Sequence, residues 1–135
     1  MDRRFGQAWI ALTVALALHV ADEVANDFLS VYNPTVRGIR DRFPLLPLPT
    51  FTFQVWLGGL VIAIVILLAL SPLAFRGVRW LRVLTLPYGA LMLLNGLGHI
   101  GSSIYYGRLM PGVYSAPFLL GASAYLLRTG NRQTE

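Results

Sequence analysis

Long runs of hydrophobic residues alternate with short polar stretches along this chain and predict helices that cross a membrane. The runs cover residues 5–28, 53–70, 81–106 and 113–127. Each is close to the ~20 residues that an α-helix needs to span ~30 Å of hydrocarbon. A segment in lipid must satisfy its own backbone hydrogen bonds, so helices are the expected form of all four. The pattern therefore predicts an all-α, four-transmembrane-helix bundle, with residues 1–135 as one integral membrane domain.

The stretches between these runs have the composition of loops. Residues 33–50 combine several prolines with arginines, so we expect a loop there rather than one regular helix. Residues 71–79 predict a short basic connection and residues 107–112 a tight turn. The polar residues 129–135 are expected to fray.

Composition supports a membrane location. Hydrophobic residues make up 56% of the chain and charged residues 13%, about half the share in a typical soluble domain. All eleven basic residues are arginines in short clusters beside the hydrophobic runs, so the net charge of +5 indicates membrane flanks rather than a nucleic-acid partner. The chain has no cysteine, which excludes disulfides and thiolate metal ligands.

The distribution of arginines predicts an orientation. With four crossings, seven arginines share the side of both termini and four lie on the other side. Because loops rich in arginine face the cytoplasm, we expect both termini there. The expected location is the inner (plasma) membrane. The two sets are Arg3, Arg4, Arg76, Arg79, Arg82, Arg128 and Arg132, against Arg37, Arg40, Arg42 and Arg108.

The amino end has a second interpretation. Two arginines followed by a hydrophobic run are typical of a secretory signal peptide, and Ala15-Leu16-Ala17 offers a cleavage-like site. The helical pattern continues past that site, which favours a membrane helix.

The first run ends in LHVADEVAND, the densest polar cluster of the chain. At 100° per residue, His19, Asp22, Glu23 and Asn26 fall on one face of the helix, because they stand at i, i+3, i+4 and i+7. The cluster can therefore face one partner helix.

The third run carries a second polar face, and its depth matches the first. This face contains Asn95, His99, Ser102, Ser103 and Tyr106. His19 lies about 22 Å beyond Arg4, and His99 lies about 26 Å beyond Arg82, at 1.5 Å per helical residue. The two faces are therefore expected to meet in the outer half of the membrane and to form one buried site.

A carboxylate in the middle of a bilayer costs about 2.5–3.5 kcal/mol, so Asp22 and Glu23 must face the bundle, form pairs or protonate. One hypothesis is a metal site in which His19, Glu23 and His99 bind zinc or non-haem iron. A second is metal-free proton transfer on a lipid-like substrate.

Two non-catalytic hypotheses stand beside these. The same residues can bind a ligand, a proton or an ion for transport, and four short helices would then favour a homodimer. The polar residues can also form only a structural network, although interhelical hydrogen bonds contribute about 0.6 kcal/mol on average, which is small against the insertion cost of two acids. The sequence does not decide between an enzyme and a binding protein.

The motif His19-Val-Ala-Asp22-Glu23, followed by Asn95-Gly-Leu-Gly-His99 and Tyr106-Gly-Arg-Leu-Met-Pro111-Gly112, resembles a family of small bacterial membrane proteins named for an HXXEE motif. In this chain the first acid is aspartate, which puts a direct metal-binding role for position 22 in doubt. The resemblance covers nearly the whole chain in order. It implies a four-helix membrane domain and points to His19, Asp22, Glu23, Asn95 and His99, but to no reaction.

These observations assign expected roles. Glu23 is the expected general base or metal ligand, and His19 and His99 are ligands or proton partners. Asp22 is an orienting second acid, and Asn95 a hydrogen-bond donor to the substrate or to His99. Asn26, Ser102, Ser103 and Tyr106 are expected around the substrate.

Overall fold

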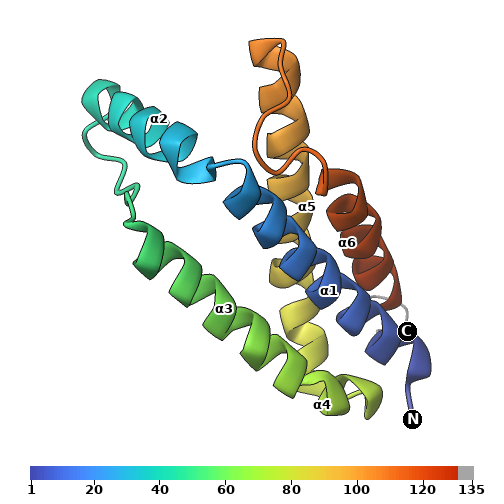
Figure 1. Ribbon diagram of the computed structural model, residues 1–135. Coiled ribbons are helices and arrows are strands. Elements are labelled where there is room, and N and C mark those ends of the chain that lie inside the picture. Colours follow the sequence, from blue (N-terminus) through green and yellow to red (C-terminus); the bar gives the residue numbers. More distant parts are fainter. Residues whose placement is uncertain (131–135) are drawn as a thin grey trace.

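The computed structural model describes residues 1–130, and this part of the chain is all-α, with no strand (Figure 1). Six helices follow one another, two more than the hydrophobic runs predict. They are α1 (Arg3–Ala25), α2 (Phe28–Arg42), α3 (Phe53–Ala69), α4 (Ser71–Phe75), α5 (Arg79–Tyr106) and α6 (Ala116–Gly130).

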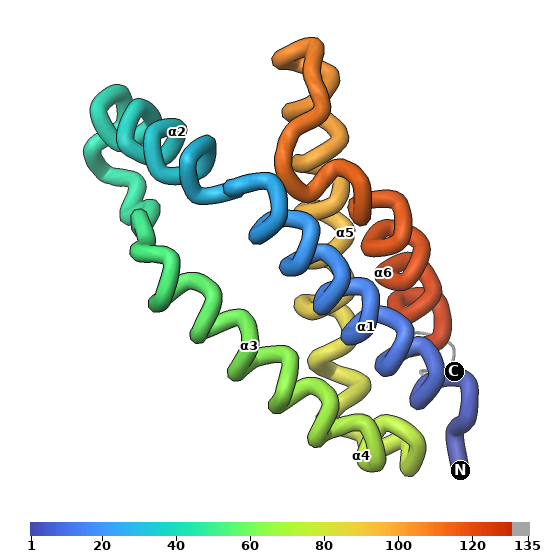
Figure 2. Tube along the Cα trace, viewed as in Figure 1, coloured from blue at the N-terminus to red at the C-terminus, as the bar shows by residue number. Residues whose placement is uncertain are grey.

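Helix α1 is the central element of the fold. It packs closely against α3, α4 and α6, and its buried face supplies most of the hydrophobic core. Phe5, Trp9 and Leu12 are each at most 1% exposed. The indole Nε1 of Trp9 donates a hydrogen bond to the carbonyl of Leu67, 2.8 Å away, which ties α1 to the end of α3. Figure 2 shows α1 between α3 and α6 along most of its length.

Helices α5 and α6 pack against each other through small residues. The position that a Cβ would take at Gly89 lies 2.7 Å from the side chain of Leu127, and that at Gly130 lies 2.4 Å from Thr85. Only glycine allows such a close approach at these two points. The approach brings the end of α6 down to the first half of α5.

Three segments are long and apolar enough to cross a membrane: Arg3–Ala25, Phe53–Phe75 and Arg79–Tyr106. The second joins α3 and α4. Helix α6 has 15 residues and is therefore about 22 Å long, which is short of a ~30 Å hydrocarbon core. The helix lengths thus support a membrane protein, whereas a fourth crossing stays a prediction. Helix α3 has no fully buried residue. One face packs partly buried against the core through Leu57, Leu60, Ile64 and Leu67, and the apolar side chains of its other faces are exposed, as expected of a surface in lipid.

The prediction that residues 33–50 form a loop was wrong in its first part. Helix α2 runs through Pro34 to Arg42, and only residues 43–52 are non-helical. Tertiary contacts explain how the helix tolerates proline: the side-chain amide of Asn33 donates to the carbonyl of Phe51 and accepts from its backbone N–H, at 2.8 and 3.0 Å. Pro34 itself is exposed, so the missing hydrogen bond lies on the outer side.

Two smaller differences concern the connections. Residues 71–75, expected as part of a simple connection, form the short helix α4. Thr129 and Gly130, expected to fray, end α6, and the rest of the predicted tail, including Arg132, lies outside the described residues.

Replacing Gly6 should destabilise the contact between α1 and α4. A Cβ at Gly6 would lie 2.3–2.6 Å from the ring of Phe75, so this half-buried ring would have to be displaced. We expect Gly6→Ala to lower the free energy of unfolding by about 1–3 kcal/mol, the usual range for overpacking. Thermal unfolding in detergent measures the effect.

Gly58→Ala is the matched control, because a Cβ at Gly58 meets nothing within 4 Å. It should leave stability unchanged or raise it by up to about 1 kcal/mol, as alanine does inside a helix. Equal unfolding temperatures for the two variants would contradict the close α1–α4 contact.

Candidate functional site

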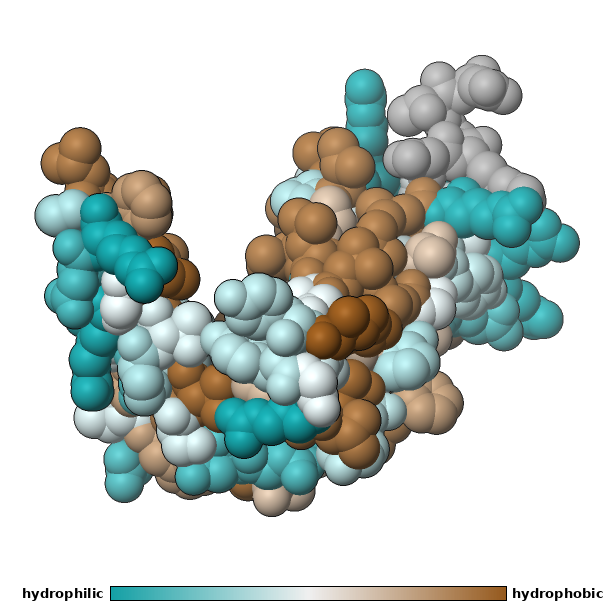
Figure 3. Space-filling view, turned by 90° about the horizontal axis from the view of Figure 1, so that it is seen from above, coloured by the Kyte–Doolittle hydropathy of each residue, from teal (hydrophilic) through white to brown (hydrophobic). Residues whose placement is uncertain are grey.

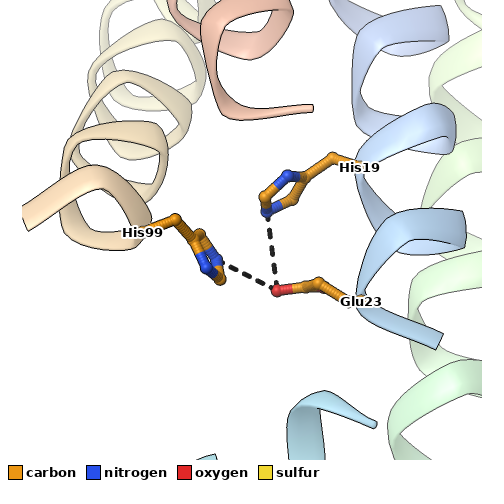
Figure 4. Close-up of side chains that lie close together, drawn as sticks. All are labelled: His19, Glu23 and His99. Carbon is orange, nitrogen blue, oxygen red and sulfur yellow. Dashed lines mark ion pairs between the residues drawn. The ribbon is translucent and has the colours of Figure 1, made fainter. Parts of the chain in front are cut away.

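Three ionisable side chains from two helices meet at one point in the interior (Figure 4). His19 and Glu23 come from successive turns of α1, and His99 comes from α5. The Oε1 atom of Glu23 lies 3.1 Å from Nε2 of His99 and 3.5 Å from Nε2 of His19. We call His19, Glu23 and His99 the buried triad. The prediction that the polar faces of the first and third runs meet is confirmed.

The triad is almost completely shielded from the surroundings. His19 is 0% exposed, Glu23 5% and His99 7%. A carboxylate in such a place must be neutralised or paired, because an unpaired buried charge is very costly. Within residues 1–130, the only ion-pair partners of Glu23 are the two imidazoles. The site is therefore compensated by a proton, on a histidine or on Glu23 itself, or by a cation bound among the three groups.

Hydrogen bonds on the far side of His99 define its tautomer. Its Nδ1 atom lies 2.6 Å from the backbone carbonyl of Pro111, which can only accept, so Nδ1 carries a hydrogen. In the neutral ring, Nε2 then holds a lone pair directed at Glu23. This arrangement, with Nδ1–H on a carbonyl and Nε2 free, is the one that metal-bound histidines adopt.

His19 is held in the same way through a serine. Its Nδ1 atom lies 2.8 Å from Oγ of Ser115, and that hydroxyl donates to a carboxylate oxygen of Asp22 at 2.8 Å. Since the hydroxyl hydrogen goes to Asp22, the serine oxygen accepts from Nδ1–H of His19. Asp22 also accepts from the backbone N–H of Ser115 at 2.9 Å. Asp22 therefore orients His19 through Ser115 and does not contact the triad directly.

The segment between α5 and α6, residues 107–115, covers one side of the triad. Gly112 has a φ of +86°, and a Cβ there would lie 2.6 Å from the ring of His99 and 3.0 Å from that of His19. Only glycine provides both the backbone conformation and the space. Polar groups of the non-helical residues 107–115 are also satisfied within the protein, through hydrogen bonds to His99 and Asp22.

The spacing of the triad fits a metal ion. Metal–ligand distances of 2.0–2.1 Å in a tetrahedral site place ligand atoms about 3.3 Å apart. The two distances from Oε1 of Glu23 to the imidazole nitrogens, 3.1 and 3.5 Å, lie on either side of this value. The three ligand atoms together lie within 4.8 Å of one another, so the side chains would have to draw slightly closer around an ion. Nε2 of His19 is buried without a hydrogen-bond partner within the described residues, and Oε1 of Glu23 lies 3.5 Å from it.

An apolar cavity of about 270 Å³ adjoins the triad at His99. Aromatic rings form much of its wall: Phe28 packs 5.6 Å from the ring of His99, and Tyr32 and Tyr106 line the cavity farther out. Among the predicted substrate residues, Asn95, Ser102 and Tyr106 line this cavity. His99 is thus the group through which a molecule in the cavity reaches the triad.

Two predicted residues lie elsewhere. The hydroxyl of Ser103 donates to the backbone carbonyl of His99 and accepts from the backbone N–H of Met110, so it shapes the turn after α5. Asn26 is exposed and donates to Asp22 at 2.8 Å, which makes it a support for that carboxylate.

Sequence reasoning did not find Ser115, the carbonyl of Pro111 or the role of Gly112. The Pro-Gly pair was part of the motif that carried the family resemblance, but it was interpreted as a turn. Ser115 gave no signal, because a single serine before a helix most often caps it.

The helices and the buried triad define the chain as an all-α protein of membrane type with a histidine–carboxylate site in its interior. A family model described as "Protein of unknown function with HXXEE motif" matches residues 9–126, well over half of the chain, and the protein belongs to this family. His19 and Glu23 are the outer letters of that motif, so the motif marks the buried triad. No curated protein and no solved structure matches the chain.

Replacing Ser115 should loosen His19 and destabilise the protein. Ser115→Ala leaves Nδ1–H of the fully buried His19 without an acceptor, which costs about 1–3 kcal/mol. Ser123→Ala is the control, because the hydroxyl of this buried serine bonds only the carbonyl of Leu119 in its own helix. We expect thermal unfolding in detergent to show a clear loss for the first variant and little change for the second. Equal behaviour would argue against the link from Asp22 to His19.

Proposed function

We propose that the protein is an integral membrane metalloprotein in which His19, Glu23 and His99 bind zinc or non-haem iron. The observation that carries this proposal is the arrangement of the two imidazoles. Each gives its Nδ1–H to an acceptor of the protein and directs Nε2 toward the same carboxylate oxygen. Two histidines and one carboxylate leave coordination positions open for water or a substrate.

We further propose that the bound metal makes the protein an enzyme for a lipid-like substrate. A metal in such a site polarises an oxygen of the substrate or activates a bound water. The aromatic cavity beside His99 gives an apolar molecule access to the site. Asn95 and Ser102 offer hydrogen bonds to its polar atoms, while Asp22 and Ser115 keep His19 in place.

Metal-free proton transfer is the second candidate function. The 3.1 Å between Oε1 of Glu23 and Nε2 of His99 is a hydrogen-bond distance, and this pair can pass a proton to a bound molecule. Non-catalytic binding or transport of a ligand, a proton or an ion, in a monomer or a homodimer, and a purely structural network are the remaining alternatives.

We propose a four-crossing topology in the plasma membrane, with both termini in the cytoplasm. Helix α6 is short, but residues 107–115 return from the end of α5 toward the triad before α6 starts, so loop and helix together can cover the bilayer. Polar groups of this returning segment contact α1 and α5 rather than lipid, which supports its place at membrane depth.

Metal analysis of the purified protein tests the proposed function. We expect close to one zinc or iron per chain after purification in detergent without chelator, and at least a tenfold lower content in His19→Ala, His99→Ala and Glu23→Gln. Glu23→Gln keeps the shape of the side chain and removes its charge, so the variant should remain folded. Asp27→Asn is the control, because Asp27 is a nearby acid at a left-handed position that asparagine tolerates.

Metal-free protein that is well folded would overturn the metal site and shift the proposal to proton transfer between Glu23 and His99. Metal that persists in all three triad variants would place the ion elsewhere in the protein.

Labelling of single cysteines tests the topology, and the absence of native cysteine makes the background low. In intact cells, a membrane-impermeant maleimide should label Ser30→Cys, at the exposed start of α2, and not Trp80→Cys, at the start of α5, where the tryptophan is 49% exposed. In permeabilised cells, both variants should be labelled. Labelling in the reverse order would contradict cytoplasmic termini.

A further inference from the structure

The apolar cavity beside the triad continues along α2. A second cavity of about 290 Å³ adjoins it, and the two share Thr35 and Tyr106 in their walls. The first ends at His99, and the second reaches Arg42, in the last turn of α2. Figure 3 shows the region from above as a wide notch between the arm at left, which carries α2, and the main body, with apolar side chains on both flanks. One continuous groove thus leads from an arginine to the triad.

One face of α2 lines this groove. Phe28, Tyr32, Thr35, Ile39 and Arg42 stand at i, i+4, i+7, i+11 and i+14, so they follow one side of the helix. Arg37 lies on the opposite side, about 180° from Phe28. The groove face is therefore aromatic and apolar at the triad end and cationic at the other end.

The volume of the groove indicates a ligand with one hydrocarbon chain. Each cavity is near the lower limit of about 300–1,000 Å³ for small-molecule sites, which leaves room for one hydrocarbon chain and not for the two of a phospholipid. Fourteen residues separate Phe28 from Arg42, which is about 21 Å along a helix. This length exceeds one leaflet of a ~30 Å hydrocarbon core, so the chain must be long.

The positive charge of Arg42, at the end of the groove far from the triad, indicates an anionic head group. Within residues 1–130, no acidic side chain forms an ion pair with Arg42, and the only arginine ion pair there joins Arg82 to Asp2. An arginine fork binds a carboxylate through two parallel hydrogen bonds. Asp41, the neighbouring acid, does not line either cavity and forms no ion pair with Arg42 within the described residues.

We propose that this groove binds a long-chain fatty acid, with its carboxylate on Arg42 and its chain along α2 to His99. The ligand would reach the triad with carbons far from its head group. The inference rests on the proposed function for what happens at the triad, but binding in the groove does not require a metal.

Photo-crosslinking tests the groove. The purified protein is irradiated with a palmitate that carries a diazirine in its chain, and peptide mass spectrometry locates the adduct. We expect adducts on α2 between residues 28 and 35 or on α5 between residues 95 and 106, suppressed by excess unlabelled palmitate. Arg42→Gln should reduce them at least tenfold, whereas Arg37→Gln, on the opposite face, should retain them.

Other outcomes overturn the proposal. Adducts spread over α3 would mean general contact with hydrocarbon. Competition by hexadecanol as strong as by palmitate would remove the role of Arg42, and stronger competition by a lysophospholipid would identify a phospholipid source instead of a free fatty acid.

Metal content measured on the same samples separates this inference from the proposed function. Arg42→Gln should keep its metal, and Glu23→Gln should keep the adduct. Bound metal without groove adducts would overturn the fatty-acid site alone, and adducts in a metal-free wild-type protein would overturn the metal site alone.

Discussion

The architecture depends on one buried carboxylate. Glu23 lies in the interior of an apolar helix bundle, where an uncompensated charge would oppose insertion and folding. Its compensation requires α1 and α5 to place their histidines at the same depth. That requirement constrains α6 as well, because α1 and α5 both pack extensively against α6 and are held relative to each other through it. The site is therefore a structural constraint as well as a chemical one.

Residues around the triad hold its two imidazoles in a defined orientation. Pro111 orients His99 through a backbone carbonyl, and Asp22 orients His19 through Ser115. Both contacts come from the loop before α6, and Gly112 lets that loop lie directly on the imidazoles. The loop and the site therefore stabilise each other: polar groups of the loop form hydrogen bonds to the site, and the same hydrogen bonds fix the tautomers of the two imidazoles.

Periodicity along the sequence could predict the meeting of His19, Glu23 and His99, since helix geometry converts residue spacing directly into face and depth. It could not predict α2 through Pro34, because bonds from Asn33 to a residue 18 positions away hold that helix. Nor could it predict Ser115, which acts across 93 residues on Asp22. Local pattern determined the long helices and the triad, whereas tertiary hydrogen bonds determined the helix with proline and the outer shell of the site.

The hydrogen bonds of the two imidazoles also limit how the negative charge of Glu23 can be compensated. A proton on Nε2 of His99 would pair with the carboxylate at 3.1 Å, but it would leave Nε2 of the fully buried His19 without a partner. Protonating both rings would direct a hydrogen from each Nε2 atom at the carboxylate, and the site would then carry a net charge of +1 in a medium of low dielectric, the same as with a divalent metal. A divalent metal would engage both lone pairs and the carboxylate together, in the tautomers that Pro111 and Ser115 already impose. Unlike a single proton shared by Glu23 and His99, a bound metal would leave neither Nε2 atom of the triad without a partner.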